Sequence, residues 1–293
     1  MTPIRLVPAA LVAALAATTT LPAHAQETAS YAVTTDVKLT TDQRSRGVSD
    51  SFNRPGAKVS VQVAHESGLV GLAEFATVSR KQFLDGAGLG ITLAGGYRFG
   101  DPEGWHYGLG LATELFPGAK FQAPHSFNME TGEPGDWRST RYPSAFAVAE
   151  IGYGNLEARV MNVISKTYRG VNTGGVCGTM LSLMPDPTPA LACYARGDHN
   201  SRGSWLFDVG YKHALNPTTT LHLHAGYQRI ANFKEANFSD YSVGITHKHW
   251  GFLWGAEWMT TRTRVRELYV AMDGTRPRAT DNSRVVLSVS RSF

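Results

Sequence analysis

The chain ends in the stretch Arg284-Val285-Val286-Leu287-Ser288-Val289-Ser290-Arg291-Ser292-Phe293, and this stretch decides the fold. Successive side chains of a β-strand point to opposite faces of the sheet. One face of this segment is therefore apolar except for Arg291, and the other face carries mainly serine. The last residues of a soluble protein usually fray, so a strong strand at the terminus needs a neighbouring strand. The pattern favours the closing strand of an outer-membrane β-barrel, with a terminal aromatic residue at the membrane interface. The alternative is an edge strand of a soluble β-sandwich.

The N-terminus predicts export. Residues 1–25 contain the single Arg5, an apolar run over 6–17 and the small-residue sequence Ala23-His24-Ala25, which together are typical of a secretory signal peptide. The apolar run is shorter than the ~20 residues that a membrane-spanning helix needs. We therefore expect residues 1–25 to be removed, and residues 26–293 to form a single domain. The chain has no block of Lys and Arg residues, which argues against nucleic acid as a partner.

The only two cysteines are Cys177 and Cys193. Exported proteins meet an oxidising compartment, so a disulfide that closes a loop is expected. The alternatives are a zinc site, which would need a matched pair of histidines, and free thiols.

Short segments with period-2 patterning alternate with turn-rich breaks along the rest of the chain. No helical period persists, and no second stretch could be a membrane-spanning helix. In a membrane the backbone must then close into a barrel, because lipid offers no hydrogen bonds to a free sheet edge. We predict an all-β, antiparallel, up-and-down transmembrane barrel of about twelve strands. The predicted strands are residues 31–40, 57–65, 69–78, 88–99, 105–114, 144–153, 156–164, 204–213, 218–228, 240–249, 252–262 and 282–293.

The lengths of the connections support the barrel more strongly than any single strand does. Every second connection is short: 66–68, 100–104, 154–155, 214–217 and 250–251. The connections between them are longer: 41–56, 79–87, 115–143, 165–203, 229–239 and 263–281. Short periplasmic turns and long external loops are typical of bacterial outer-membrane barrels. A soluble sandwich has no reason to sort its loops in this way.

Aromatic residues fall mostly on the apolar faces, several of them near strand ends, as in the aromatic belts of membrane proteins. The alternative is a set of core aromatics in a soluble barrel. These residues are Tyr31, Trp105, Tyr107, Trp205, Tyr211, Tyr227, Tyr241, Trp250, Phe252, Trp254, Trp258 and Phe293.

Two short motifs carry a family resemblance. They are Arg46-Gly47-Val48-Ser49, within residues 41–51, and the turn His65-Glu66-Ser67-Gly68. With Pro55 between them, they resemble the N-terminal signature of the TorF-type porins, an outer-membrane family catalogued as bacterial proteins of unknown function. Segments 240–244 and 283–293 are also similar to the end of that family. The resemblance implies a porin-like barrel and provides no catalytic residues. Thr41 and Gln43 depart from the signature, and loops 115–143 and 165–203 are longer than the family leads us to expect.

Charged residues of both signs lie on the polar faces of the predicted strands. Such side chains are costly to bury unless they are paired or hydrated. A barrel of about twelve strands lies between the filled eight-stranded type and the wide porins. We therefore expect a narrow, hydrated lumen of mixed charge without strong anion or cation preference; the alternative is a salt-bridged plug that conducts nothing. The predicted pore-lining residues are Arg98, Glu114, Arg159, Asp208, Lys212, His222, His224, Glu257 and Arg284.

Passive diffusion of small hydrophilic solutes is thus the predicted function, and no cofactor or metal is expected. His222 and His224 have a spacing compatible with a metal ion, but a polar pair in the lumen is the simpler interpretation because no third ligand is evident. The alternatives are a structural or adhesive barrel that acts through its long loops and, less favoured, an outer-membrane lipid hydrolase. His65 and Ser67 suggest a hydrolase, but neighbours in a turn are not expected to converge, and His125-Ser126 and His199-Asn200-Ser201 place no nucleophile beside a base.

The expected partners are outer-membrane lipids and lipopolysaccharide, small hydrophilic solutes, and the barrel assembly machinery, which would bind the C-terminal strand ending at Phe293. The sequence leaves the oligomeric state open.

Overall fold

The structure of the protein is a computed structural model that describes residues 30–293. Residues 31–293 form one compact unit. The predicted signal peptide, residues 1–25, lies outside the described residues.

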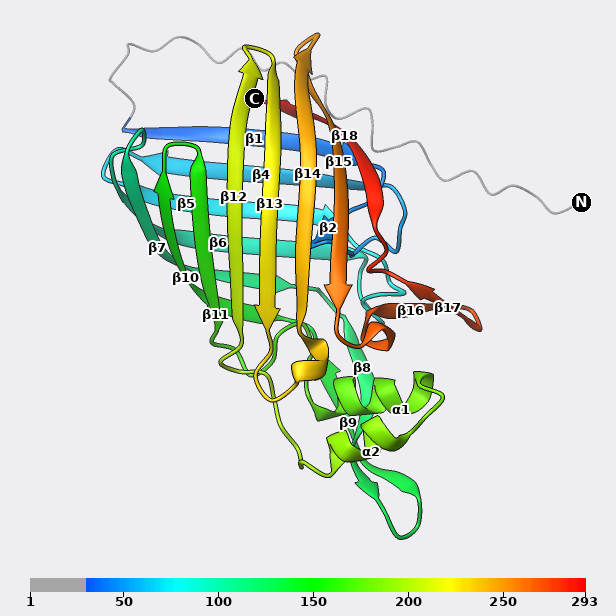
Figure 1. The fold of residues 1–293 in the computed structure, drawn as a ribbon. Coiled ribbons are helices and arrows are strands. Elements are labelled where there is room, and N and C mark those ends of the chain that lie inside the picture. Colours follow the sequence, from blue (N-terminus) through cyan, green and yellow to red (C-terminus); the bar gives the residue numbers. More distant parts are fainter. Residues whose placement is uncertain (1–29) are drawn as a thin grey trace, which may run out of the picture. The chain divides into compact units, whose positions relative to one another are not determined.

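Twelve strands form a closed antiparallel barrel in which neighbours along the chain are also neighbours in the sheet (Figure 1). The fold class predicted from the sequence is confirmed, and most strand ends lie within two residues of their predicted positions. The barrel strands are β1 (Tyr31–Thr40), β4 (Gly56–His65), β5 (Leu69–Thr77), β6 (Leu89–Gly100), β7 (Trp105–Leu115), β10 (Ser144–Tyr153), β11 (Leu156–Val163), β12 (Trp205–Asn216), β13 (Thr219–Arg229), β14 (Phe238–His249), β15 (Phe252–Thr263) and β18 (Arg284–Ser292).

The C-terminal strand closes the barrel. β18 pairs with β15 on one side and with β1 on the other, in the register Asp36↔Ser292 to Thr40↔Ser288. Phe293 continues the ladder, because its N–H donates to the carbonyl of Thr35 at 2.9 Å and its carbonyl accepts from the Thr35 N–H at 3.1 Å. β18 is therefore paired on both sides up to Ser290, the last three residues are held by β1, and the barrel is closed.

The outer face of the barrel is apolar. All twelve aromatic residues predicted for the belt are exposed, from 37% for Phe252 to 83% for Trp250. Aliphatic side chains such as Leu109, Leu223 and Val243 lie exposed between them. A monomer in water rarely exposes a continuous apolar surface of this extent. Within residues 30–293, no helix has the length and hydropathy needed to cross a membrane.

The two ends of the barrel differ, as the lengths of the predicted connections indicated. One end, the turn end, carries tight turns and the C-terminus; at the β14–β15 turn, Trp250 and Gly251 adopt positive φ values of 52° and 77° (Figure 1). Positive φ at both central residues is the geometry of a two-residue hairpin turn. The other end, the loop end, carries six longer loops: L1 (41–55), L2 (78–88), L3 (116–143), L4 (164–204), L5 (230–237) and L6 (264–283).

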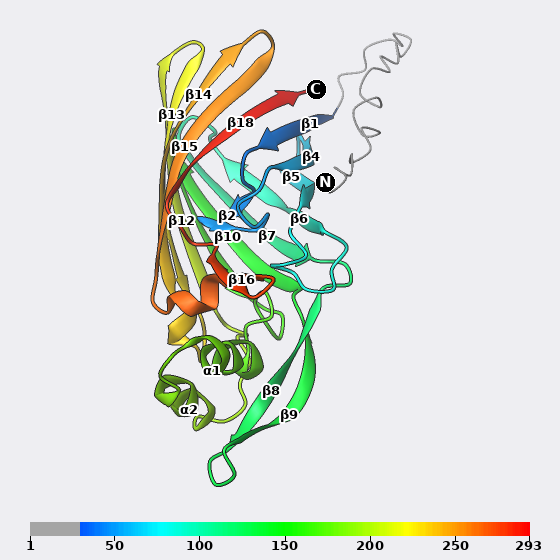
Figure 2. The same ribbon diagram turned by 90° about the vertical axis from the view of Figure 1, so that its right-hand side faces the viewer.

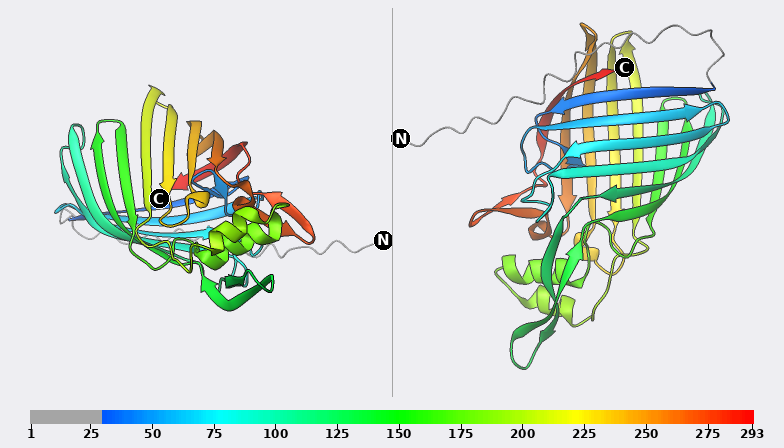
Figure 3. Two further views of the ribbon diagram at one scale, coloured as in Figure 1. Left: turned by 60° about the horizontal axis from the view of Figure 1, so that its bottom comes forward. Right: turned by 180° about the vertical axis from the view of Figure 1, so that it is seen from behind.

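The loops have structure of their own, which Figures 2 and 3 show gathered at one end of the barrel. L1 contains a small hairpin of β2 (Arg44–Ser45) and β3 (Val48–Ser49), and L3 contains the longer hairpin of β8 (Lys120–Asn128) and β9 (Glu133–Arg141). The remaining elements are η2 (Gly174–Gly178), α1 (Thr179–Leu183) and α2 (Thr188–Tyr194) in L4, η3 (Lys234–Ala236) in L5, and η4 (Arg266–Tyr269), β16 (Val270–Asp273) and β17 (Arg276–Ala279) in L6.

The main hydrophobic core lies under L4 and not in the middle of the barrel. Phe146 and Leu206, at the loop ends of their strands, pack with Val176, Met180 and Tyr194 of L4. This distribution is the reverse of a soluble barrel, where apolar side chains fill the interior. The centre of the barrel instead holds charged side chains such as Glu150 and Arg159 beside small and aliphatic ones.

Candidate functional site

The interior of the barrel contains a cavity of about 750 Å³. Five of the residues predicted to line a pore lie on its wall: Arg98, Glu114, Arg159, Asp208 and His224. They come from β6, β7, β11, β12 and β13, so the cavity is bounded by much of the barrel circumference.

The other four predicted residues lie elsewhere on the inner face. The His222 Nε2 atom is 2.8 Å from the Thr246 hydroxyl, and Glu257 accepts a hydrogen bond of 2.6 Å from Ser242. Lys212 stands opposite His222 in the β12–β13 register. Arg284 contacts L1, because its guanidinium donates to the carbonyl of Asn53 at 3.1 Å. The structure therefore places five of the nine residues on the cavity wall, groups Lys212, His222 and Glu257 elsewhere on the inner face, and leaves Arg284 beside L1.

The Arg46-Gly47-Val48-Ser49 motif forms the tip of the L1 hairpin, which reaches into the barrel (Figure 2). Arg46 and Gly47 both have positive φ, 51° and 76°, as a two-residue hairpin turn requires. The Arg46 guanidinium donates to both carboxylate oxygens of Asp208 at 2.7 and 2.8 Å, and lies 3.5 Å from the Asp240 carboxylate. A Cβ on Gly47 would clash with the Thr261 hydroxyl, so only glycine allows this approach to the wall.

A buried carboxylate keeps L1 rigid. Asp42 accepts hydrogen bonds from the Arg44 guanidinium at 2.7 Å and from the hydroxyls of Ser49 and Ser51 at 2.6 and 3.0 Å. L1 is also joined to L6, because the Ser49 N–H donates to the carbonyl of Thr280 at 2.9 Å. The hairpin is thus a fixed part of the lumen.

Two carboxylates that the sequence reasoning missed organise the charges of the lumen wall. Glu150 on β10 accepts from Arg159 at 2.8 Å and from Arg98 at 3.0 Å, and Glu74 on β5 pairs with Lys58 at 2.9 Å. Both faces of β5 and β10 are largely apolar in sequence, so alternation alone could not show which face points inward. The pairing partners, on other strands, would have been the available signal.

At the loop end, Arg169 of L4 spans the mouth of the lumen. Its guanidinium donates to Glu114 of β7 at 2.8 Å and to Asp50 of L1 at 3.0 Å, and it reaches the Ser45 hydroxyl at 3.2 Å. Its side chain also packs on Phe116, with 5.4 Å between the guanidinium carbon and the ring centroid. One side chain therefore connects L4, L1 and the barrel wall.

For both Asp50 and Arg169, burial and the nearest opposite charge shift the pKa in opposite directions. Burial raises the pKa of Asp50 to about 6, although Arg169 acts to lower it, and Glu114 adds to the rise. Burial also acts to lower the pKa of Arg169, but the carboxylates of Asp50 and Glu114 outweigh it and hold that pKa well above its ordinary value. The neighbouring Tyr168 is buried, which raises the pKa of its phenol to about 12.

A second cavity of about 600 Å³, the outer chamber, lies among the loops. Its wall includes Trp137 of β9, Gln228 of β13, and Lys81 and Met272 from L2 and L6. The lumen cavity and the outer chamber share two wall residues, Ser45 and Tyr168. These two shared residues lie where Arg169 connects L1 to L4.

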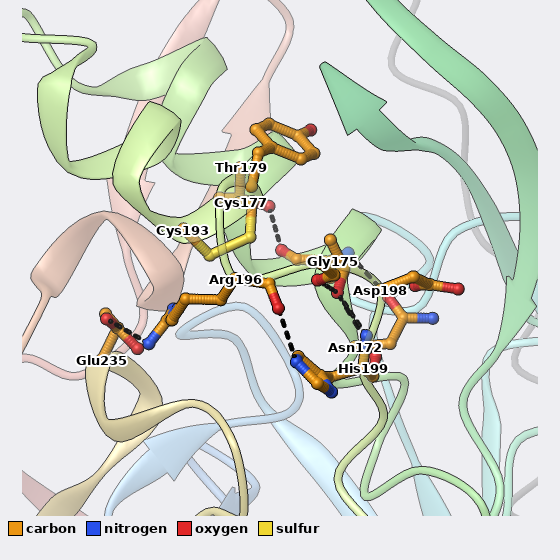
Figure 4. The surroundings of a disulfide bond; sticks show 12 residues. Asn172, Gly175, Cys177, Thr179, Cys193, Arg196, Asp198, His199 and Glu235 are labelled. Atoms are coloured by element: carbon orange, nitrogen blue, oxygen red, sulfur yellow. Dashed lines mark hydrogen bonds and ion pairs between the residues drawn. A yellow bond between two sulfur atoms is a disulfide. The ribbon is translucent and has the colours of Figure 1, made fainter. Parts of the chain in front are cut away.

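L4 is held together by a disulfide between Cys177 and Cys193, which joins η2 to α2 (Figure 4). Around it, the Thr179 hydroxyl donates to the carbonyl of Gly175 at 2.7 Å, and Arg196 pairs with Glu235 of L5 at 3.2 Å. The bridge and the ion pair fix the helical part of L4 beside L5.

One expectation about the turn after β4 was wrong: His65 and Ser67 do converge. The His65 Nδ1 atom is 2.8 Å from the Ser67 hydroxyl and accepts the Ser67 N–H at 3.1 Å. Gly68 has a φ of 96°, and its N–H donates to the carbonyl of His65 at 2.9 Å, which closes the turn. Since Nδ1 also accepts from the backbone, the contact is a local cap of an exposed turn.

The other histidines considered for hydrolysis have structural partners. His125 Nδ1 is 2.7 Å from the carboxylate of Asp198, and His199 Nε2 is 2.8 Å from the carbonyl of Arg196. Ser201 is buried and donates to the carbonyl of Val171 at 2.7 Å. Among residues 30–293, no group of three or more His, Cys, Asp or Glu side chains is arranged to hold a metal ion.

Comparison with known proteins gives a family and remote structural likenesses. The profile of the family described as "Bacterial protein of unknown function (Gcw_chp)" matches residues 24–293. No curated protein matches the sequence. Among solved structures, the KdgM porin is 8% identical, with a TM-score of 0.46 over 89% of this chain and 99% of that chain. The NanC porin is 8% identical, with a TM-score of 0.49 over 87% of this chain and 97% of that chain.

Proposed function

This chain belongs to the Gcw_chp family of bacterial proteins of unknown function, and we propose that it is a porin-like channel of the bacterial outer membrane. Small hydrophilic solutes would diffuse through it passively. The family assignment covers the whole barrel. We further propose that the chain is related to the TorF-type porins, on the basis of the Arg46-Gly47-Val48-Ser49 motif.

One observation carries the proposal: an edgeless barrel has its apolar residues outside and its charged residues inside. Lipid offers no hydrogen bonds to the backbone. A closed sheet needs none, because every strand is hydrogen-bonded to a neighbour on each side. The exposed aromatic and aliphatic side chains of the outer face suit a hydrocarbon environment with interfacial belts. In this orientation the turn end faces the periplasm and the loop end faces outward. The signal peptide predicted at residues 1–25 supports the same location.

The proposed path runs from the outer chamber, past the boundary at Ser45 and Tyr168, into the lumen cavity. Its pore-lining residues are Arg98, Glu114, Arg159, Asp208 and His224, to which we add Arg46, Glu74 and Glu150. Most of these charges are paired across strands, so the wall offers alternating signs without a ring of one sign. Selectivity in such a pore comes from width and charge distribution. We therefore expect weak discrimination between small anions and cations.

The passage needs no cofactor, and we propose no catalytic role. Lipids and lipopolysaccharide would surround the outer face. The barrel assembly machinery would recognise the C-terminal strand ending at Phe293.

A liposome-swelling assay tests the proposal. Purified, folded protein should make liposomes permeable to small neutral sugars, at rates that fall steeply with solute size. Heat-modifiable mobility on gels would first establish that the barrel is folded. Liposomes that contain the folded barrel and stay impermeable to every solute would refute the channel.

A structural or adhesive barrel is the second candidate, and the β8–β9 hairpin is the observation that favours it. Trp137 on this hairpin is 61% exposed and Met129 at its tip is 53% exposed, although both lie in a loop outside the apolar belt. Deleting residues 128–133 would abolish adhesion and leave solute permeability intact if this candidate is correct.

A further inference from the structure

We propose that Ser45, Asp50, Glu114 and Arg169 form a proton-controlled latch that closes the passage between the outer chamber and the lumen. We call this group the Arg169 latch. The inference rests on the proposed channel function and adds a means of regulating it.

The latch lies beside the wall residues that the lumen cavity and the outer chamber share. The two cavities share the wall residues Ser45 and Tyr168, and Arg169 hydrogen-bonds the first and follows the second in the chain. Its side-chain partners belong to two other parts of the molecule, L1 and the wall strand β7. Separating Arg169 from Asp50, which would hydrate the carboxyl, would free L4 from L1 beside these shared wall residues.

The rest of the mouth is attached independently, so the latch can move as a local element. L1 is held by the Asp42 network and by the Arg46–Asp208 pair. The helical part of L4 is held by the Cys177–Cys193 disulfide. Arg169 itself has a φ of 46° and precedes Gly170, which has a φ of 78°. Two consecutive residues in the left-handed region form a sharp corner, where a small backbone change redirects the side chain.

Asp50 is the group whose protonation would control the latch. The charged or titratable groups around it are Arg169 and Tyr168 from L4, Glu114 from β7 and Asp42 from L1. Tyr168 stays neutral below pH ~12, because burial raises its pKa. The L2 cations on the chamber wall are engaged elsewhere, since Lys81 pairs with Asp273 and Arg80 donates to the carbonyl of Ala87. Asp42 is paired with Arg44 at 2.7 Å, so Arg169 is the cation that the Asp50 and Glu114 carboxylates share.

The direction of the effect follows from the pKa of Asp50. In the closed latch burial raises that pKa to about 6, against an ordinary value of 3.8. In an open latch the carboxyl would be hydrated and its pKa would return toward the ordinary value. The closed form therefore binds the proton more tightly. Falling pH favours closure, up to about tenfold per pH unit between pH ~6 and pH ~4, and rising pH favours opening.

Single-channel recording of the folded, full-length mature protein in planar bilayers tests the latch. Between about pH 7.5 and pH 4.5 we expect the ratio of open to closed time to fall at least tenfold. Asp50→Asn, which is neutral at every pH, should remain mostly closed and lose the pH response. The matched control is Asp136→Asn, an exposed loop carboxylate paired with Arg138, which should behave like the wild type.

A second variant keeps the test decisive if Asp50→Asn fails to fold. Arg169→Lys keeps the charge but loses the planar fork that reaches two carboxylates, and it should be open at both pH values. A pH response that persists in Asp50→Asn, or a wild type whose gating ignores pH, overturns the latch while leaving the channel intact. Absence of conductance in the wild type and in Arg169→Lys, with both proteins folded, would instead refute the proposed function on which the latch rests.

Discussion

Replacing Leu223 by arginine tests the orientation of the outer face. Leu223 lies near the middle of β13, is 40% exposed, and stands between Tyr211 and Val243 in the sheet register. An arginine on the lipid face of a transmembrane barrel costs about 2–4 kcal/mol at the bilayer midplane. That cost lowers the folding equilibrium constant by roughly 30-fold to 1,000-fold.

The neighbouring residue provides the control. His222→Arg places the same side chain on the inner face, close to Lys212 and Glu257, where water and a carboxylate can accommodate it. Urea titration of folding into lipid vesicles, followed by tryptophan fluorescence, measures both variants. A change in stability of less than ~0.5 kcal/mol for Leu223→Arg, as for an ordinary exposed site in water, or an equal cost for His222→Arg, would show that the outer face does not contact lipid.

Further substitutions probe the loops and the lumen. Replacing Cys177 and Cys193 by serine should destabilise the helical part of L4 by about 3 kcal/mol, so limited proteolysis should cut near residues 177–193 and leave the heat-modifiable barrel; an uncut loop would contradict the role of the bridge. Glu150→Ala removes the carboxylate shared by Arg98 and Arg159, so reversal potentials in a salt gradient should shift toward anion permeability, and Glu157→Ala should shift them less in the same direction because it leaves Glu150 in place. Arg46→Ala leaves the Asp208 and Asp240 carboxylates uncompensated; thermal unfolding should show a loss on the order of 3 kcal/mol, and recordings should show larger, more cation-preferring steps.

Most strands of this barrel could be predicted because apolar residues of the outer face alternate along the strand with polar residues of the inner face. In β18 and β12, apolar and polar residues alternate, so pattern and face agree. The turns were equally local: the short connections at Gly154 and at Trp250-Gly251 need only the residues they contain. The same reasoning failed for β5 and β10, because their inner faces carry apolar residues such as Leu72 and Phe146 as readily as a charge. The inward direction of Glu74 and Glu150 was missed for that reason.

The mouth of the lumen could not be predicted, because its contacts join residues far apart in the chain. Arg169 meets Asp50 across 119 residues, and Arg46 meets Asp208 across 162. The Arg46-Gly47-Val48-Ser49 motif was evident in the sequence as a family resemblance. Its physical role, a hairpin tip that fits only because Gly47 has no side chain, required the wall it contacts. Local patterns therefore located the strands, while the fold alone located the constriction.

Current through a single reconstituted barrel tests the central claim most directly, since that claim is an aqueous passage enclosed by an edgeless sheet. Folded, heat-modifiable protein added to a planar bilayer at neutral pH should produce discrete, uniform conductance steps. Bilayers that remain electrically silent although the same preparation inserts as a folded barrel would contradict the claim.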